Sequence, residues 1–412
     1  MPEFLVLQRP LEALDELLRN IPPVMLKKIT VPTGDSLGRI SAEIVFSPEQ
    51  SPAFRRSTVD GYALIARDSF GSSESLPAFF KVIGEIRMGK KDEYILNKGE
   101  TVMIHTGGML PEKCDAVVMM ENTQISRSNE IEVFKAVSSG ENILEMGEDL
   151  NNGEEIISSG KIIRTADIGG LLAVGITEVT VYEKPRIGIL SSGDELVNPS
   201  KKPEAGQVRD INSSMLAALI EKHGGIPVMY PIMPDDSDKM KEVISGAFKV
   251  CDSLIITAGS SASTRDFTAQ IVRQLGKPGI LSHGVNIKPG KPTILAVCGG
   301  KPVIGLPGNP VSALVIAILF VIPMVKKLSG ITRQFPLIRG KAKISVNLAS
   351  VSGREDYWPV KFIESDSEII AEPIFYKSNL IFTLVKADGL VIVPADANGI
   401  AAGELIEFIQ VE

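Results

Sequence analysis

Cysteine and histidine are scarce in this chain of 412 residues, with three of each. Cys114, Cys251 and Cys298 lie far apart without a CxxC spacing, and the histidines are equally scattered along the chain. This argues against a zinc or iron–sulfur site. An odd number of isolated cysteines also argues against a disulfide framework and fits a reducing compartment.

Basic residues are fewer than acidic residues, and long apolar runs are few. Lys and Arg number 43 against 50 Asp and Glu, a net charge of -7, so the overall field does not favour nucleic acid or anionic lipid. One apolar run, residues 311–325, is shorter than the roughly 20 residues that span a bilayer and predicts a buried core helix. The first ten residues lack a basic segment and a cleavage site, so we expect a cytoplasmic protein.

Four regions of different pattern predict a multidomain α/β and β fold. Residues 184–330 alternate strands and helices, which predicts a doubly wound α/β domain with helices on both faces. Short β-type runs predict a β-rich inserted domain over 51–140 and a C-terminal β-barrel-like domain over 331–412. Residues 1–50, with an N-terminal amphipathic helix, are expected to join 141–183 in a discontinuous mixed linker domain.

Acidic side chains in the loops of the α/β domain are the first candidates for chemistry. Ligands of open α/β sheets lie beyond the carboxyl ends of the strands, where this chain has loops rich in Gly, Ser, Asn and Pro. Such loops favour phosphate, and Glu195, Asp235 and Asp266 would need Mg²⁺ to tolerate it. Each loop alone could also be an ordinary turn, and Asp235 could cap the helix that begins near residue 238.

Two further segments carry charged or hydroxyl side chains at turns. Prolines stiffen the segment KPGKP, residues 288–292, so Lys288 and Lys291 could both be directed at one oxyanion; a surface turn is the alternative. In the β-rich region, Asp60 stands at a glycine turn and Thr106 begins a small-residue loop. By composition alone both are turns.

The assembled strings resemble one family, the molybdopterin molybdenumtransferases, which includes the E domain of gephyrin. The strings that carry the resemblance are RSTVDGYAL, IHTGGMLP followed by DAVVMMEN, GED at 147–149, SSGDEL, GQVRDIN, IKPGKP and GKPVIGLPGNPVSAL. A single string would be weak evidence, whereas seven in the family's order over about 250 residues are highly specific.

The resemblance implies an elongated homodimer of four-domain chains, with an active site between the α/β domain of one subunit and the β-rich domain of the other. The implied reaction inserts molybdate into adenylylated molybdopterin with Mg²⁺ and releases AMP. Implied partners are a second copy, the molybdopterin adenylyltransferase and molybdoenzyme chaperones, with no nucleic acid and no membrane.

Site residues are carried over by motif. The residues assigned to catalysis are Asp60, Glu195, Asp235, Asp266, Lys288 and Lys291. Asp235 and Asp266 are also assigned to Mg²⁺. The residues assigned to substrate are Thr106, Asp149, Ser261, Pro292, Ser312, Arg354 and Ser378, of which Arg354 and Ser378 are candidate molybdate ligands.

One loop departs from the family pattern. Ala258 and Ser263 stand where the family usually has glycine, so a backbone with positive φ there would be strained. The departure keeps open a tungstate-specific enzyme or a non-catalytic pterin-binding or scaffold protein. The related molybdopterin adenylyltransferase is a further alternative, against which the extra β-rich domains speak.

Overall fold

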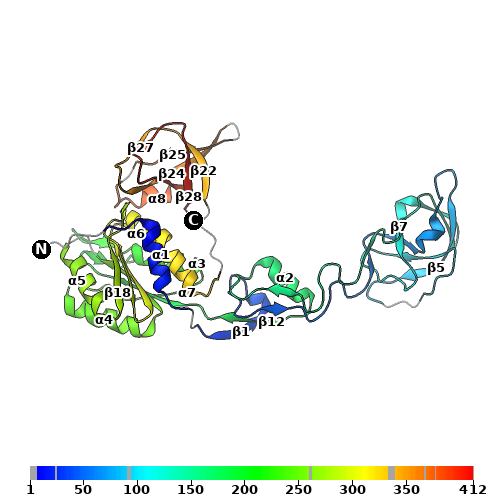
Figure 1. Cartoon of the computed structure of the whole chain (residues 1–412), viewed down its shortest axis with the longest axis horizontal. Coiled ribbons are helices and arrows are strands. Elements are labelled where there is room, and N and C mark those ends of the chain that lie inside the picture. Colours follow the sequence, from blue (N-terminus) through cyan, green and yellow to red (C-terminus); the bar gives the residue numbers. More distant parts are fainter. Residues whose placement is uncertain are drawn as a thin grey trace.

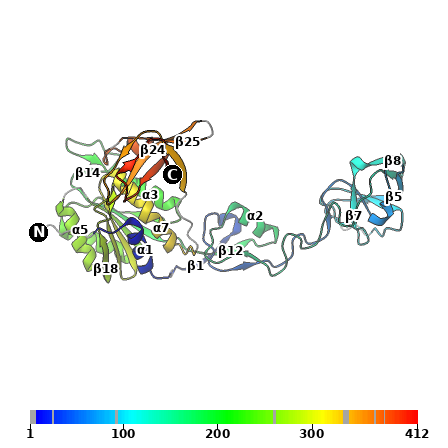
Figure 2. The same ribbon diagram turned by 45° about the horizontal axis from the view of Figure 1, so that its top comes forward.

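The computed structural model describes residues 7–23, 26–90, 94–258, 262–332, 339–365, 368–375 and 377–411, and the side chains of 262–266, 339 and 365 are not among what it describes. The molecule is elongated (Figures 1 and 2). An α/β unit and a β-barrel lie together at one end, a small linker unit lies in the middle, and a β-rich unit lies at the far end.

The linker unit consists of short strand pairs and one helix. Its strands are β1 (Lys28–Pro32), β12 (Glu178–Tyr182), β2 (Val45–Phe46) and β11 (Glu155–Ile157). β1 pairs antiparallel with β12, and β2 pairs antiparallel with β11. The helix α2 (Thr165–Ala173) packs on them, and the small core includes Ile157, Leu171 and Val181. Segments from both sides of the β-rich region therefore form one unit.

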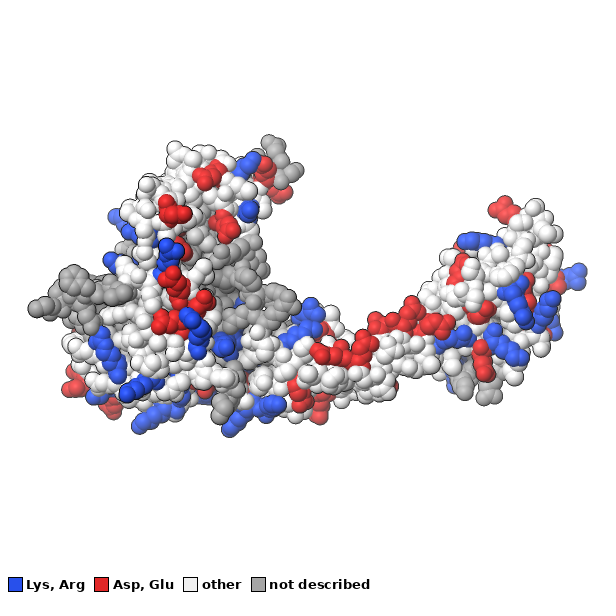
Figure 3. All heavy atoms as spheres, viewed as in Figure 1, with Lys and Arg blue, Asp and Glu red and all other residues white. Residues whose placement is uncertain are grey.

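The β-rich unit is a six-stranded sheet in the order β7-β4-β6-β5-β9-β8. Its strands are β4 (Gly61–Leu64), β5 (Ala78–Ile86), β6 (Glu100–Ile104), β7 (Ala116–Met119), β8 (Thr123–Arg127) and β9 (Glu130–Val133). The short pair β3 (Arg56–Ser57) and β10 (Ile143–Leu144) lies at its base. Acidic side chains gather along the arm that leads to this unit (Figure 3). The exposed acids of this segment are Glu145, Glu148, Asp149, Glu154 and Glu155.

The α/β unit is built on a six-stranded sheet in the order β16-β13-β17-β21-β20-β18. Its strands are β13 (Arg186–Ser191), β16 (Ile226–Met229), β17 (Ser253–Ala258), β18 (Pro278–His283), β20 (Ile294–Cys298) and β21 (Lys301–Pro307). The first four strands of the order are parallel, β20 runs antiparallel to β21, and the edge strand β18 runs antiparallel to β20. The buried strands are apolar on both faces, as expected where helices cover a sheet from both sides.

Helices cover both faces of this sheet, as the sequence predicted. α4 (Ser237–Val250) and α5 (Ala262–Gln274) pack on one face. α3 (Asn212–Lys222), α6 (Pro310–Ile316), the π-helical turn η4 (Ala317–Val321) and α7 (Ile322–Leu328) pack on the other. The long apolar segment Pro310–Leu328 is 72% buried, which confirms a core helix.

The N-terminal helix α1 (Pro10–Asn20) does not belong where the sequence analysis placed it. Ala13 and Leu17 are buried in the core of the α/β unit, beside strands β18 and β20, rather than in the linker unit. The apolar face of α1 covers the part of the sheet that α3 and α7 leave open, and Pro22 and Pro23 separate the helix from β1. Its amphipathic pattern showed that it packs, but not against which partner.

The C-terminal region closes into a barrel. The ring β24-β25-β22-β28-β26 returns to β24, with β19 (Ile287–Lys288) added alongside β24. The strands are β22 (Arg339–Ile344), β24 (Glu355–Ser365), β25 (Glu368–Pro373), β26 (Gly389–Val393) and β28 (Leu405–Gln410). The sequence predicted this barrel but neither the short helix α8 (Phe382–Val385) nor the edge strand β18.

Candidate active site

A cavity of about 340 Å³ lies at the carboxyl ends of β13, β17 and β21. Ser192 follows β13, Ala258 ends β17 and Gly308 follows β21, and all three line the cavity. Asn379, from the C-terminal region, lines it as well. The cavity therefore occupies the edge at which open α/β sheets bind ligands.

Two buried oxygens in the cavity wall have no protein partner among the described residues. They are Ser192 Oγ and Asn212 Oδ1, in residues that are 1% and 8% exposed. Asn212 Nδ2 donates to the carbonyl of Gly308 at 2.8 Å, which fixes the amide. A buried polar atom without a partner is costly, so both oxygens are suited to a bound ligand or cation.

A hydrogen-bonded network of hydroxyl groups connects the elements that form the cavity. Ser191 Oγ lies 2.9 Å from Thr257 Oγ1 and 2.7 Å from Ser213 Oγ. Ser213 in turn donates to the buried carboxylate of Asp210 at 2.7 Å. The network joins β13, β17 and the start of α3 and gives the cavity a rigid base.

The structure places the predicted acids Glu195, Asp235 and Asp266 differently with respect to the cavity. Glu195 lines the cavity, and the backbone N–H of Asp235 donates to Asp194 at 3.2 Å in the neighbouring loop. Asp236, not Asp235, caps α4, because its carboxylate accepts from the backbone N–H groups of Asp238 and Lys239. Asp266 begins the second turn of α5, and its side chain is not described. Ser261 lies outside the described residues altogether.

The two positions where the family usually has glycine are regular secondary structure here. Ala258 lies in β17 and Ser263 in α5, so neither needs a glycine-like backbone.

A second cluster joins Lys288 to the start of the barrel. The strand pair β19–β24 places Lys288 opposite Asp356, whose side chain is 1% exposed. Asp356 accepts a 2.8 Å hydrogen bond from Arg354 Nε and lies 3.7 Å from Lys288 Nζ. Lys288 Nζ also lies 5.6 Å from the ring centroid of Trp358. The structure thus brings together two of the predicted oxyanion ligands, whereas Lys291 is exposed on the following turn.

Ser378 lies against the loop that precedes α6. Its hydroxyl accepts a 3.0 Å hydrogen bond from Asn309 Nδ2, and its carbonyl accepts one from the N–H of Val311. Asn309 stands at the N-cap position of α6 without a side-chain cap hydrogen bond, and its side chain instead ties this loop to the C-terminal region. Ser312 is buried one turn further on, and Pro292 is half-buried before β20.

Asp60 and Thr106 form a separate site in the β-rich unit. Asp60 Oδ1 accepts from the backbone N–H of Thr106 at 2.8 Å and from its hydroxyl at 3.3 Å. The backbone hydrogen bond from Thr106 holds the pKa of Asp60 below its usual value, and His105, 3.7 Å away, lowers it further. Within one chain this unit lies at the opposite end from the cavity (Figure 1). Asp149 is exposed on the acidic arm, where its backbone N–H donates to the carbonyl of Ser51.

Sequence reasoning missed three residues of these sites. Asn379 and Asp356 come from the C-terminal region, and their positions depend on contacts between units that no local pattern reveals. Asn212 stands in the string GQVRDIN, so its motif was noted although the residue was not singled out. The described residues contain no group of three or more metal-binding side chains.

Three family models match the chain in sequence order. They are the MoeA N-terminal region (domain I and II) at residues 9–175, a probable molybdopterin binding domain at 188–327, and the MoeA C-terminal region (domain IV) at 341–411.

Curated proteins and solved structures match along nearly the whole chain. A putative molybdopterin biosynthesis protein of Methanocaldococcus jannaschii is 35% identical over 384 residues, covering 90% of this chain and 89% of that protein. A molybdopterin molybdenumtransferase of Staphylococcus epidermidis is 30% identical over 390 residues, covering 94% and 92%. The crystal structure of a molybdopterin biosynthesis moeA protein from Pyrococcus horikoshii OT3 superposes with a TM-score of 0.85 at 31% identity, covering 98% of this chain and 100% of that one.

Proposed function

The chain belongs to the MoeA family of molybdopterin molybdenumtransferases, and from this membership and the geometry of its sites we propose how its residues divide the reaction. Its function is that of a molybdopterin molybdenumtransferase. In the reaction we propose, molybdate enters adenylylated molybdopterin and AMP leaves. The observation that carries the proposal is the cavity at the sheet edge, with its two buried unpartnered oxygens.

We propose that the cavity receives the phosphate-bearing part of the substrate. Ser192 Oγ has no described partner and can donate to a phosphate oxygen, whereas Asn212 Oδ1 only accepts and would face Mg²⁺ or a donor group of the substrate, so binding there offsets an existing cost. The hydrogen bond to Gly308 fixes the amide of Asn212, and Ser261 is assigned to the same phosphate by its motif. Glu195 lines the cavity and is assigned to catalysis.

The donor set of the cavity fits Mg²⁺, because it offers carboxylate, amide and hydroxyl oxygens and no sulfur. Asp235 and Asp266 would hold the ion, and Glu195 lines the cavity. When bound, Mg²⁺ would neutralise phosphate oxygens that the acids would otherwise repel. The finding that Asp236 caps α4 supports this assignment, since Asp235 is not used as the helix cap.

Lys288 and Arg354 are proposed to bind the tetrahedral oxyanion substrate, together with Lys291, Pro292, Ser312 and Ser378. Cations and hydroxyl donors suit a dianion. Asp356 acts as a positioning residue, because its buried carboxylate fixes the guanidinium of Arg354 and attracts the ammonium of Lys288. Neither the charge nor the donor set of this cluster distinguishes molybdate from tungstate.

Asp60 and Thr106 are proposed to act on the cavity of a second copy, in a homodimer. The distance between the two ends of one chain requires this if the assignment of both residues is right (Figure 1). The same proposal includes a contact of Asp149 with the substrate. It divides the chain into four domains, with α1 counted in the α/β domain. It further includes a cytoplasmic location and contact with the adenylyltransferase and molybdoenzyme chaperones.

The experiment that tests the function mixes the protein with adenylylated molybdopterin, Mg²⁺ and either molybdate or tungstate. AMP release and the mass of the metallated pterin are followed, and the oxyanion that turns over identifies the metal. Asp266→Ala should abolish AMP release while the chain stays folded. A fully active Asp266→Ala variant would contradict the role of that residue, and bound but unconverted pterin in the unaltered protein would point to a binding protein.

At Ala258 and Ser263, backbone strain does not favour a non-catalytic protein. Ala258 ends a strand and Ser263 lies in a helix, so replacing the family glycines strains neither position.

A further inference from the structure

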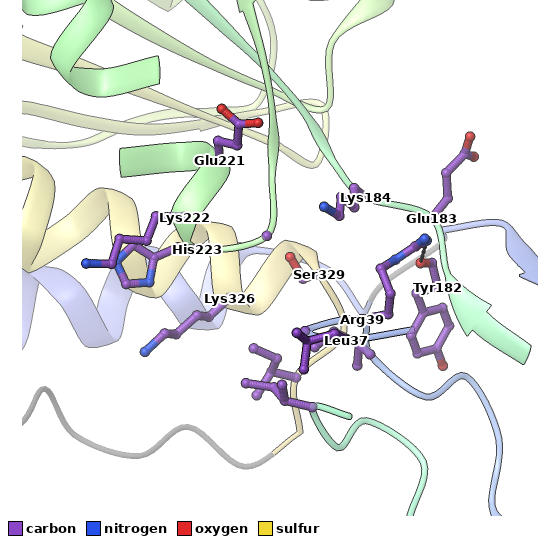
Figure 4. A pocket seen from close by; sticks show the side chains of 15 residues that line it. Leu37, Arg39, Tyr182, Glu183, Lys184, Glu221, Lys222, His223, Lys326 and Ser329 are labelled. Carbon is purple, nitrogen blue, oxygen red and sulfur yellow. Dashed lines mark hydrogen bonds between the residues drawn. The ribbon is translucent and has the colours of Figure 1, made fainter. Parts of the chain in front are cut away.

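A second cavity, of about 270 Å³, lies where the linker unit meets the α/β unit (Figure 4). Arg39, Tyr182 and Lys184 line it from the linker unit and the segment that leads into β13. Lys222 at the end of α3 and Lys326 in α7 line it from the α/β unit. None of the functions assigned above uses these residues.

Cationic groups border this cavity on both sides. In Figure 4, Lys222 and Lys326 lie on one side, and Lys184 and Arg39 lie on the other. The lining carboxylates, Glu183 and Glu221, are exposed to solvent, and Figure 4 shows them directed outward. Four basic side chains thus line the cavity against two carboxylates, and an excess of one sign of charge around a concave site attracts counter-ions.

Lys184 and Lys326 are half-buried and have no carboxylate within 4 Å among the described residues. Helix C-termini favour cations, which accounts for Lys222 and Lys326 without a ligand. That explanation does not apply to Lys184 or Arg39, which lie outside helices. Burial lowers the pKa of Arg39, and only the neighbouring Glu183 opposes this effect. The cavity thus has two half-buried lysines, Lys184 and Lys326, that no described carboxylate neutralises.

We propose that this cavity binds a small polyanion with phosphate-type groups. Its volume is below the range typical of drug-sized ligands, which favours a compact anion over a whole nucleotide. Charge-assisted hydrogen bonds from lysine and arginine suit phosphoryl oxygens. The proposal does not depend on the transferase function and concerns a separate site.

A ligand here would join the two units. Arg39 is tied to the linker by a 2.9 Å hydrogen bond to the carbonyl of Tyr182, whereas Lys326 belongs to a core helix of the α/β unit. An anion held by both would restrain the angle between these units. That angle sets where the β-rich unit points.

Inorganic pyrophosphate without Mg²⁺ is the probe, with inorganic phosphate as the smaller comparison, and binding is measured by titration calorimetry on the full chain. The double variant Lys184→Met/Lys326→Met removes two charges but keeps the apolar stems, and should weaken pyrophosphate binding by at least about tenfold. The matched control is Lys241→Met/Lys277→Met, which makes the same change in net charge at exposed positions outside the cavity and should bind as the unaltered protein does.

Amide hydrogen exchange locates the site independently of the variants. Pyrophosphate should slow exchange at residues 36–40 and 222–224, which border the cavity. The proposal is overturned if the unaltered protein does not bind pyrophosphate, if the Lys184/Lys326 variant binds as tightly as the control, or if protection is confined to residues 192–196 of the active-site cavity.

Discussion

Arg354 Nε donates a 2.8 Å hydrogen bond to Asp356, a carboxylate that is only 1% exposed. The same carboxylate faces Lys288 from the neighbouring strand, so one buried anion orders two cations from different units of the molecule. Lys288 and Arg354 are 66 positions apart in sequence and are adjacent here because β19 joins the barrel. The proposed oxyanion site therefore exists only when the α/β unit and the barrel are docked.

Asp356→Asn tests this relationship. The amide keeps the shape of the side chain but loses its charge, so Arg354 and Lys288 should lose their fixed directions. We expect the KM for molybdate to rise by at least about tenfold and kcat to fall less, with a stability loss of about 1–3 kcal/mol. Steady-state AMP release at varied molybdate measures both constants.

The control for that variant is Glu364→Gln, an exposed position on the same strand β24. It should leave both constants unchanged. An unchanged molybdate KM in Asp356→Asn would show that the buried carboxylate stabilises the barrel without ordering the site.

Gly61 follows Asp60 and permits a close approach of two strands. A Cβ atom at Gly61 would lie 2.0 Å from the carbonyl oxygen of Val118, so β4 and β7 would have to separate. Gly61→Ala should therefore cost about 1–3 kcal/mol and displace Asp60 from Thr106. Urea unfolding followed by amide exchange in the β-rich unit measures this loss.

Gly34→Ala is the matched control, since no atom lies within 4 Å of a Cβ there and φ is not positive. It should change stability by less than about 0.5 kcal/mol. Equal effects of the two substitutions would mean that the strands adjust without strain.

Asp167 makes the linker unit sensitive to acid. Burial alone would raise its pKa, but hydrogen bonds from Arg164 and Lys161 outweigh burial and bring the pKa to about 2. Because the folded value is below the unfolded one of about 3.9, the stabilisation is complete above pH 4 and is lost as pH falls towards 2. It amounts to about 2 kcal/mol.

Asp167→Asn should therefore lower the urea midpoint of the linker unit at pH 7, and the difference from the unaltered protein should shrink between pH 4 and pH 2. Amide exchange at α2 reports this unit separately from the others. A difference that stays constant down to pH 2 would show that the loss comes from the helix cap, where Asp167 accepts from the backbone N–H of Arg164, and not from its charge.

Local patterns predicted most of this fold, and non-local contacts account for what they missed. Alternation of apolar runs located β13, β17 and the helix at 310–328, because strand and helix periods are properties of a short segment. The placement of α1 and the partnership of Asp356 with Lys288 depend on which surfaces meet after folding. Composition likewise made Asp60 a turn residue, and only the family strings suggested a site there.

A mixture of two inactive variants tests whether Asp60 works on the cavity of a second copy. Asp60→Ala and Glu195→Ala change residues at opposite ends of the chain (Figure 1), so a mixed dimer would have one site with both defects and one site intact. If chains exchange at random, half of the dimers are mixed, and activity per site should recover to about a quarter of the unaltered value. AMP release after co-refolding at equal amounts measures it. If both residues served the cavity of their own chain, each site would carry one defect and the mixture would stay inactive.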